Sequence, residues 1–166
     1  MNGSPTGSQA AALIARLDWA TSPLGDASHW PQSLRTAVDI VIHSPMPMLL
    51  LWGDELTQIY NDGFALLAGN KHPQAFGQPT HRVWPEMQHF TAPIYSAVLA
   101  GQVRTFSEQR FVLQRNHRDT EIWLDLTYSP IRDERGRVAG VLVPAIETNE
   151  RRQLAQGLQQ RSEASL

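Results

Sequence analysis

The sequence predicts an α+β domain with a five-stranded antiparallel sheet and short helices on one face. Two long strand-like segments, residues 103–114 and 121–132, flank a polar stretch, and a tight turn leads to a third strand at 138–146. An earlier apolar hairpin at residues 48–60 supplies two more strands, and helical segments lie before and between the strands. Neighbouring strands joined by short turns pair antiparallel, which favours this fold class over a parallel α/β sheet.

The N-terminal region is expected to be a helical extension. Residues 1–16 are predicted to be flexible or helical, because the first eight are rich in Gly, Ser, Thr and Pro. A clearer helix is predicted over residues 32–43, where apolar residues form one stripe. Pro31 suits a first helical position, and Pro45 pushes the residue before it out of the helical region. The helix should therefore begin and end at these prolines.

The hairpin and the helix after it carry strong local signals. Gly53-Asp54 suits a tight turn between the strands 48–52 and 56–60. Asn61 can cap a helix over residues 62–68 with its side-chain oxygen, and Gly69 can end that helix.

The remaining elements follow in order. Residues 84–99 predict a helix that is interrupted or kinked near Pro93. The two long strands come next, joined by a polar loop at residues 115–119. After the last strand, residues 148–166 predict a polar linker helix that leaves the domain. Residues 17–147 would then form the body of the domain.

Composition excludes several classes of function. The formal net charge of −2 and the lack of a basic face argue against nucleic acid as a partner. The absence of cysteine excludes disulfides, thiolate metal sites and cysteine nucleophiles, and it fits a cytoplasmic protein. No apolar run is long enough for a membrane span. No catalytic constellation, phosphate-binding loop or metal-ligand set stands out, so we expect neither an enzyme nor a metal site.

Six short motifs occur in a characteristic order along the chain. They are Trp30-Pro31-Gln32-Ser33-Leu34-Arg35, Trp52-Gly53, Tyr60-Asn61-Asp62, Lys71-His72-Pro73, Trp84-Pro85-Glu86 and Tyr128-Ser129-Pro130. Together they resemble the PAS domains of bacterial sensor histidine kinases, and the resemblance covers roughly residues 17–152. It implies a PAS fold with a C-terminal exit helix.

The resemblance also implies a function. The expected role is the sensory input module of a bacterial two-component signal-transduction protein, with a small molecule bound in an internal pocket. The change would pass through the C-terminal helix to an effector, such as a histidine kinase, outside this chain. A homodimer formed through the N-terminal or C-terminal helices is expected. A ligand-free interaction and dimerisation module is the alternative.

The end of the last strand departs from the family pattern. PAS domains usually end it with Asp-x-Thr, whereas here Glu147 and Thr148 are adjacent. The resemblance assigns signal transfer to these two residues, with Glu147 as a substitute for the aspartate.

Strand alternation gives the candidate pocket. Between residues 121 and 130, the apolar side chains fall at every second position, which marks the core face. Residues on the neighbouring strands and in the helical region are expected to complete the pocket wall around this row of side chains. The candidate pocket residues are Tyr60, Trp84, Val112, Gln114, Leu124, Leu126, Tyr128, Val143 and Ala145.

The cofactor stays open, but two are disfavoured. Flavin adduct chemistry of the LOV type needs a cysteine, and the sequence has none. The resemblance also places Leu124 and Ala145 where those flavin pockets carry amides. In heme-binding relatives the iron ligand lies in the long helix, near His89. Counting back from Gly101, however, places that position on Phe90, and a one-residue slip turns a helical side chain by about 100°. Heme is therefore not expected.

Overall fold

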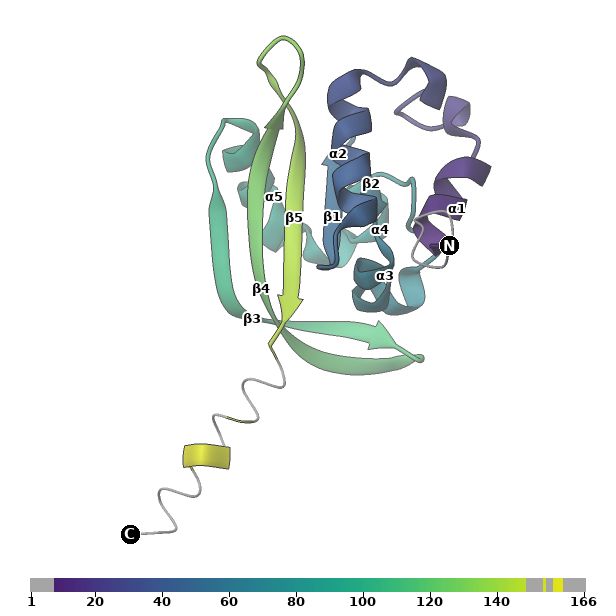
Figure 1. Ribbon diagram of the computed structural model, residues 1–166. Coiled ribbons are helices and arrows are strands. Elements are labelled where there is room, and N and C mark those ends of the chain that lie inside the picture. The colour runs from purple at the N-terminus through teal and green to yellow at the C-terminus, as the bar shows by residue number, and fades with distance from the viewer. Residues whose placement is uncertain (1–7, 149–153, 155–156, 160–166) are drawn as a thin grey trace.

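The computed structural model describes residues 8–148, 154 and 157–159, and its centre is a five-stranded antiparallel sheet (Figure 1). The strands are β1 (Met48–Trp52), β2 (Thr57–Tyr60), β3 (Arg104–Arg115), β4 (Arg118–Arg132) and β5 (Val138–Glu147). Their order in the sheet is β2-β1-β5-β4-β3. The predicted fold class is confirmed.

Short helices surround the sheet. They are α1 (Gln9–Arg16), α2 (Gln32–His43), α3 (Asp62–Ala68), α4 (Thr80–Val83) and α5 (Gln88–Leu99), with 3-10 turns at Trp19–Thr21, Ala27–His29, Gly69–Lys71 and Pro85–Met87. The predicted interruption at Pro93 is wrong, since α5 continues through it, and the alternative of a kink there stays a prediction. The buried side chains Ile94 and Val98 anchor the later turns to the core and offset the one hydrogen bond that proline cannot donate.

The two faces of the sheet carry different helices. Leu49 and Val143 lie opposite each other on β1 and β5, on the face that α3, α4 and α5 cover. Leu50 and Leu142 lie on the other face, where α2 packs over the sheet (Figure 1). The space between the sheet and the α3–α5 layer is therefore the place for an internal cavity.

The β3–β4 hairpin is longer than predicted. Its turn is only Asn116-His117, both with positive φ (51° and 62°), and Arg115 pairs directly with Arg118. Two left-handed residues make a turn whose twist matches antiparallel strands, and asparagine tolerates that conformation well. The predicted loop at 115–119 is corrected accordingly. A bulge at Glu108 (φ 51°) bends the hairpin, and its far end passes under α3 (Figure 1).

A carboxylate from a distant turn caps α2. Pro31 has no side chain that can cap the helix, and Glu134 of the β4–β5 turn takes this role. Its carboxylate accepts hydrogen bonds from the Ser33 amide and hydroxyl, both at 2.7 Å. These bonds, the side-chain bond first, hold the pKa of Glu134 below its usual value. The contact ties the N-terminus of α2 to the last hairpin.

The N-terminal extension packs on its own domain. The Gln9 and Ala10 amides donate to the carboxylate of Asp62 at 3.1 and 2.8 Å, and Ala10 and Leu13 are buried. Among the residues described, no helix has the length and apolar character that a membrane span requires. Most of the predicted linker helix at 148–166 lies outside the described residues. Leu154 and residues 157–159 are helical. The division of the chain into three parts stays a prediction.

Candidate ligand pocket and its exit strand

A cavity of about 80 Å³ lies between the sheet and the helices. Its wall is formed by Leu49, Phe64, Leu67, Trp84, Met87, Thr91, Tyr95, Phe111, Leu113, Leu124, Leu126, Tyr128 and Val143. None of these side chains carries a formal charge at neutral pH, and five are aromatic. The wall is the kind of apolar surface that encloses small-molecule ligands in proteins.

The cavity is small. Sites for drug-sized ligands usually enclose about 300–1,000 Å³, and an apolar cavity of about 150 Å³ can hold benzene. A volume of about 80 Å³ exceeds the space that one water needs, but it is below both of these values. This conformation therefore has room for a molecule of a few heavy atoms.

Two tyrosines stand together in the wall. The rings of Tyr95 and Tyr128 meet edge to face, with centroids 6.0 Å apart. Burial raises the pKa of both hydroxyls, and for Tyr95 a hydrogen bond with Thr80 offsets the shift in part. Both hydroxyls therefore remain protonated at neutral pH and can act as neutral hydrogen-bond donors.

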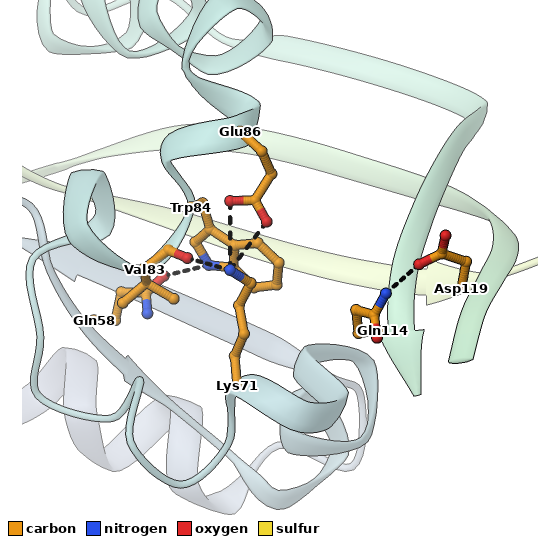
Figure 2. A network of polar contacts seen from close by, with 7 residues as sticks. All are labelled: Gln58, Lys71, Val83, Trp84, Glu86, Gln114 and Asp119. Carbon is orange, nitrogen blue, oxygen red and sulfur yellow. Dashed lines mark hydrogen bonds and ion pairs between the residues drawn. The ribbon is translucent and has the colours of Figure 1, made fainter. Parts of the chain in front are cut away.

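A polar network holds the Trp84 side of the wall (Figure 2). The Trp84 indole donates to Oε1 of the buried Gln58 at 2.9 Å. The Lys71 ammonium lies 4.9 Å from the Trp84 ring centroid, a distance that permits a cation–π interaction. The same ammonium donates to the Val83 carbonyl at 2.6 Å and pairs with Glu86 at 3.0 Å. Trp84 is thus held by Gln58 of β2 and by Lys71 of the Gly69–Lys71 turn.

The structure brings part of the predicted pocket together. Five of the nine predicted residues line the cavity: Trp84, Leu124, Leu126, Tyr128 and Val143. Tyr60 and Ala145 are buried but do not line it. The Tyr60 hydroxyl instead bonds Nδ1 of His72 at 2.7 Å.

The placement of Val112 and Gln114 in the interior is wrong. Val112 is 46% exposed, and Gln114 is exposed and bonds Asp119 across the hairpin (Figure 2). The reason is the turn. A loop centred on residue 117 would set Val112 opposite Ile122, whereas the observed turn sets Phe111 there. A slip of one residue moves every side chain of a strand to the other face.

Sequence reasoning missed eight residues of the cavity wall, five of them in helical segments. The missed residues are Leu49, Phe64, Leu67, Met87, Thr91, Tyr95, Phe111 and Leu113. The two on β3, Phe111 and Leu113, could have been found by placing the turn at Asn116-His117. For the residues in helical segments, the sequence offers only their mostly apolar character. This does not distinguish a residue that lines the cavity from one that packs in the core.

The last strand ends in a set of specific contacts. Glu147, opposite Leu124 of the cavity wall, forms an ion pair with Arg115 at 2.8 Å. Because β4 lies between β3 and β5, this ion pair spans it. Thr148 is 2% exposed, and its amide donates to the Trp123 carbonyl at 2.8 Å. Both predicted signal-transfer residues are thus held against β3 and β4.

The histidine considered for heme lies away from the cavity. His89 is exposed on α5 and is absent from the cavity wall. The next residue, Phe90, packs on Phe106 and Phe111, with ring centroids 5.3 and 5.6 Å apart. Among the described residues, no group of three or more His, Asp or Glu side chains is placed to hold a metal ion.

Many solved structures share this fold, among them three with TM-scores of 0.53 to 0.56. The chain matches an RNA-binding light-oxygen-voltage receptor at 21% identity and a TM-score of 0.53, over 87% of this chain but only 40% of the receptor. It matches the PAS domain of Bordetella pertussis BvgS at 16% identity and a TM-score of 0.56, over 80% of this chain and 98% of that domain. It matches a Rhodobacter sphaeroides LOV protein at 14% identity and a TM-score of 0.54, over 71% and 68%.

Identities this low show the fold and no more. None of the curated proteins compared with the chain matches it. The family model described as the PAS fold matches residues 43–153, which include the whole sheet and the cavity wall. The chain therefore belongs to the PAS-fold family, whose members are typically non-catalytic sensory modules.

Proposed function

We propose that the chain is the sensory input module of a bacterial signal-transduction protein. It binds a small molecule in the cavity and passes the change to an effector, such as a histidine kinase, through the C-terminal helix. One observation carries the proposal: the apolar cavity lies directly against β5, the strand that leads toward that helix.

The route from the cavity to the exit is short. On β5, Val143 lines the cavity, and Ala145 and Glu147 follow on the same face. On β3, Leu113 lines the cavity, and Arg115 follows on the same face. A ligand that favours one spacing of these strands shifts the population of states in which Arg115 and Glu147 can pair. The contacts at the end of β5 then report on the cavity.

The second candidate is a ligand-free interaction and dimerisation module. One observation favours it: Ile40 on α2 is 53% exposed beside a groove that Leu142 of the sheet also lines. Such an apolar groove could receive a second copy through its N-terminal helices. A measurement of ligand occupancy separates the two candidate functions.

We expect Val143→Phe to abolish ligand occupancy, because the larger side chain enters the cavity from β5. Val112→Phe is the matched control, since Val112 is 46% exposed on the outer face of β3. Native and denaturing mass spectrometry of each purified protein measure the mass of any bound molecule. Wild type and Val112→Phe should retain an extra mass that Val143→Phe lacks. An extra mass that persists in Val143→Phe, or none in wild type, would contradict the proposal, and the latter would favour the second candidate.

A further inference from the structure

One residue of the cavity wall lies outside the regular elements. The other wall residues belong to β1, β3, β4, β5, α3, α5 or the Pro85–Met87 turn, where helix or strand hydrogen bonds fix the backbone. Among the described wall residues, Trp84 alone stands between two elements, after α4 and before that turn. Residues that join short elements can move while the rest of a fold stays in place. Trp84 is therefore the part of the wall that can open at the smallest cost to the fold.

Trp84 also lies between the cavity and the solvent. Its side chain lines the cavity, yet the residue is partly exposed, and the next two residues, Pro85 and Glu86, are exposed. Wall residues on the sheet, such as Leu124 and Val143, are buried and offer no passage to solvent. Outward movement of the Trp84 indole would connect the cavity with the surrounding water.

A buried hydrogen bond fixes the closed position of the indole. Its N–H donates to Oε1 of Gln58 at 2.9 Å, and Gln58 is fully buried. The side-chain amide of Gln58 donates in turn to the Ala75 carbonyl at 3.3 Å, so its oxygen stays directed at the indole. Such a bond defines one closed state of Trp84 rather than a range of positions.

The second contact with the indole is ionic and lies at the surface (Figure 2). The Lys71 ammonium lies 4.9 Å from the Trp84 ring centroid, donates to the Val83 carbonyl at 2.6 Å and pairs with Glu86 at 3.0 Å. The Lys71 and Glu86 side chains are 30% and 54% exposed, and an ion pair at such exposure is weak and screened by salt. One cation thus ties the Gly69–Lys71 turn to the residues on both sides of Trp84, through contacts that break and re-form readily.

We propose that Trp84 is the gate through which a ligand enters and leaves the cavity, and that Lys71 holds this gate closed. The inference rests on the proposed function and adds how ligand exchange is controlled. Lys71 is a positioning residue, because it contacts Trp84 and is not part of the cavity wall. The gate closes over the empty and the filled cavity alike, so weakening its contacts speeds entry and exit together. The exchange rate then rises while the affinity stays nearly the same.

Lys71→Met tests the proposal on the full chain, because it removes the ammonium and keeps a long side chain. Acetone is the probe, since it is small and uncharged. Titration followed by the NMR shifts of the Leu124 and Leu126 amides measures its affinity, and relaxation dispersion of these amides at partial saturation measures its exchange rate. We expect exchange to become about three- to tenfold faster, the usual contribution of one cation–π contact and one exposed ion pair. The affinity should remain nearly unchanged.

Three comparisons separate a gate from a merely structural role. Glu86→Gln removes the ion pair and should also speed exchange, whereas Glu121→Gln, which breaks the exposed pair with Arg110 on the β3–β4 hairpin, is the matched control and should leave it unchanged. Added salt should speed exchange in wild type but not in Lys71→Met, where no ion pair is left to screen. The Trp84 indole N–H should show dispersion at the same rate as the cavity amides.

The outcomes separate this inference from the proposed function. If acetone binds, but Lys71→Met lowers its affinity without changing the exchange rate or changes neither, then Lys71 does not hold a gate, although the cavity binds ligands. If Lys71→Met does not fold, an exchange rate in wild type that is independent of salt overturns the gate. If acetone shifts none of the cavity amides, the cavity is closed to ligands, and the proposed function fails with the inference.

Discussion

Replacing Asn61 with alanine is expected to destabilise the protein by about 3–5 kcal/mol, the sum of a lost helix cap and several unpaired buried groups. Asn61 is 4% exposed, and its side-chain oxygen accepts from the amides of Met48 and Phe64, both at 3.0 Å. Its amide group donates to the carbonyls of Val41 and Met46 at 3.1 and 2.8 Å. One side chain thus joins the end of α2, the start of β1 and the start of α3.

Urea denaturation of the purified protein measures this loss. Asn61→Asp keeps the accepting oxygen but sets a carboxylate against the carbonyls, so it should also destabilise strongly. Asn70→Ala removes an asparagine whose contact with His117 is exposed, and it should change stability by less than about 0.5 kcal/mol. A loss below about 1 kcal/mol for Asn61→Ala would contradict the role given to this side chain.

The second large effect is expected at Gly69. This residue ends α3 with φ of 59°, and a Cβ there would lie 2.2 Å from the Gln114 carbonyl oxygen. Gly69→Ala should therefore destabilise the protein by about 2–4 kcal/mol, through backbone strain and through the clash. Because Leu113 beside Gln114 lines the cavity, relief of the clash also moves the cavity wall.

Gly136→Ala is the matched control for this prediction. Gly136 has a similar positive φ of 78°, but a Cβ there would meet no atom within 4 Å. Gly136→Ala should therefore destabilise the protein by about 1 kcal/mol, from backbone strain alone. Urea denaturation measures the loss of stability in both variants. The NMR chemical shift of the Leu113 amide reports the movement of the cavity wall. Equal losses in the two variants would show that α3 and the β3–β4 hairpin do not press on each other.

The fold could be predicted because its signals are local. The cap at Asn61 was predicted from residue type and position alone, and the structure confirms it. The row from Ile122 to Tyr128 was predicted from strand alternation, and all four apolar members are buried. Such patterns need no knowledge of distant contacts.

The candidate site was harder to predict because it depends on register and on packing. Val112 and Gln114 were predicted to lie inside, but the observed turn pairs Val112 with Glu121 and Gln114 with Asp119, and alternation then places both on the outer face. Tyr95 and Phe64 reach the cavity only through the packing of α5 and α3 on the sheet. The ion pair between Arg115 and Glu147 spans 32 residues, and a charge pattern does not reveal such a pair.

The central claim of this account is that occupancy of the cavity changes the contacts at the end of β5. The Thr148 amide reports them directly, because it donates to the Trp123 carbonyl at 2.8 Å. Hydrogen exchange of this amide, measured by NMR with and without saturating acetone, tests the claim. We predict a changed exchange rate in wild type and an unchanged rate in Val143→Phe. An unchanged rate in wild type, while the cavity amides shift, would contradict it.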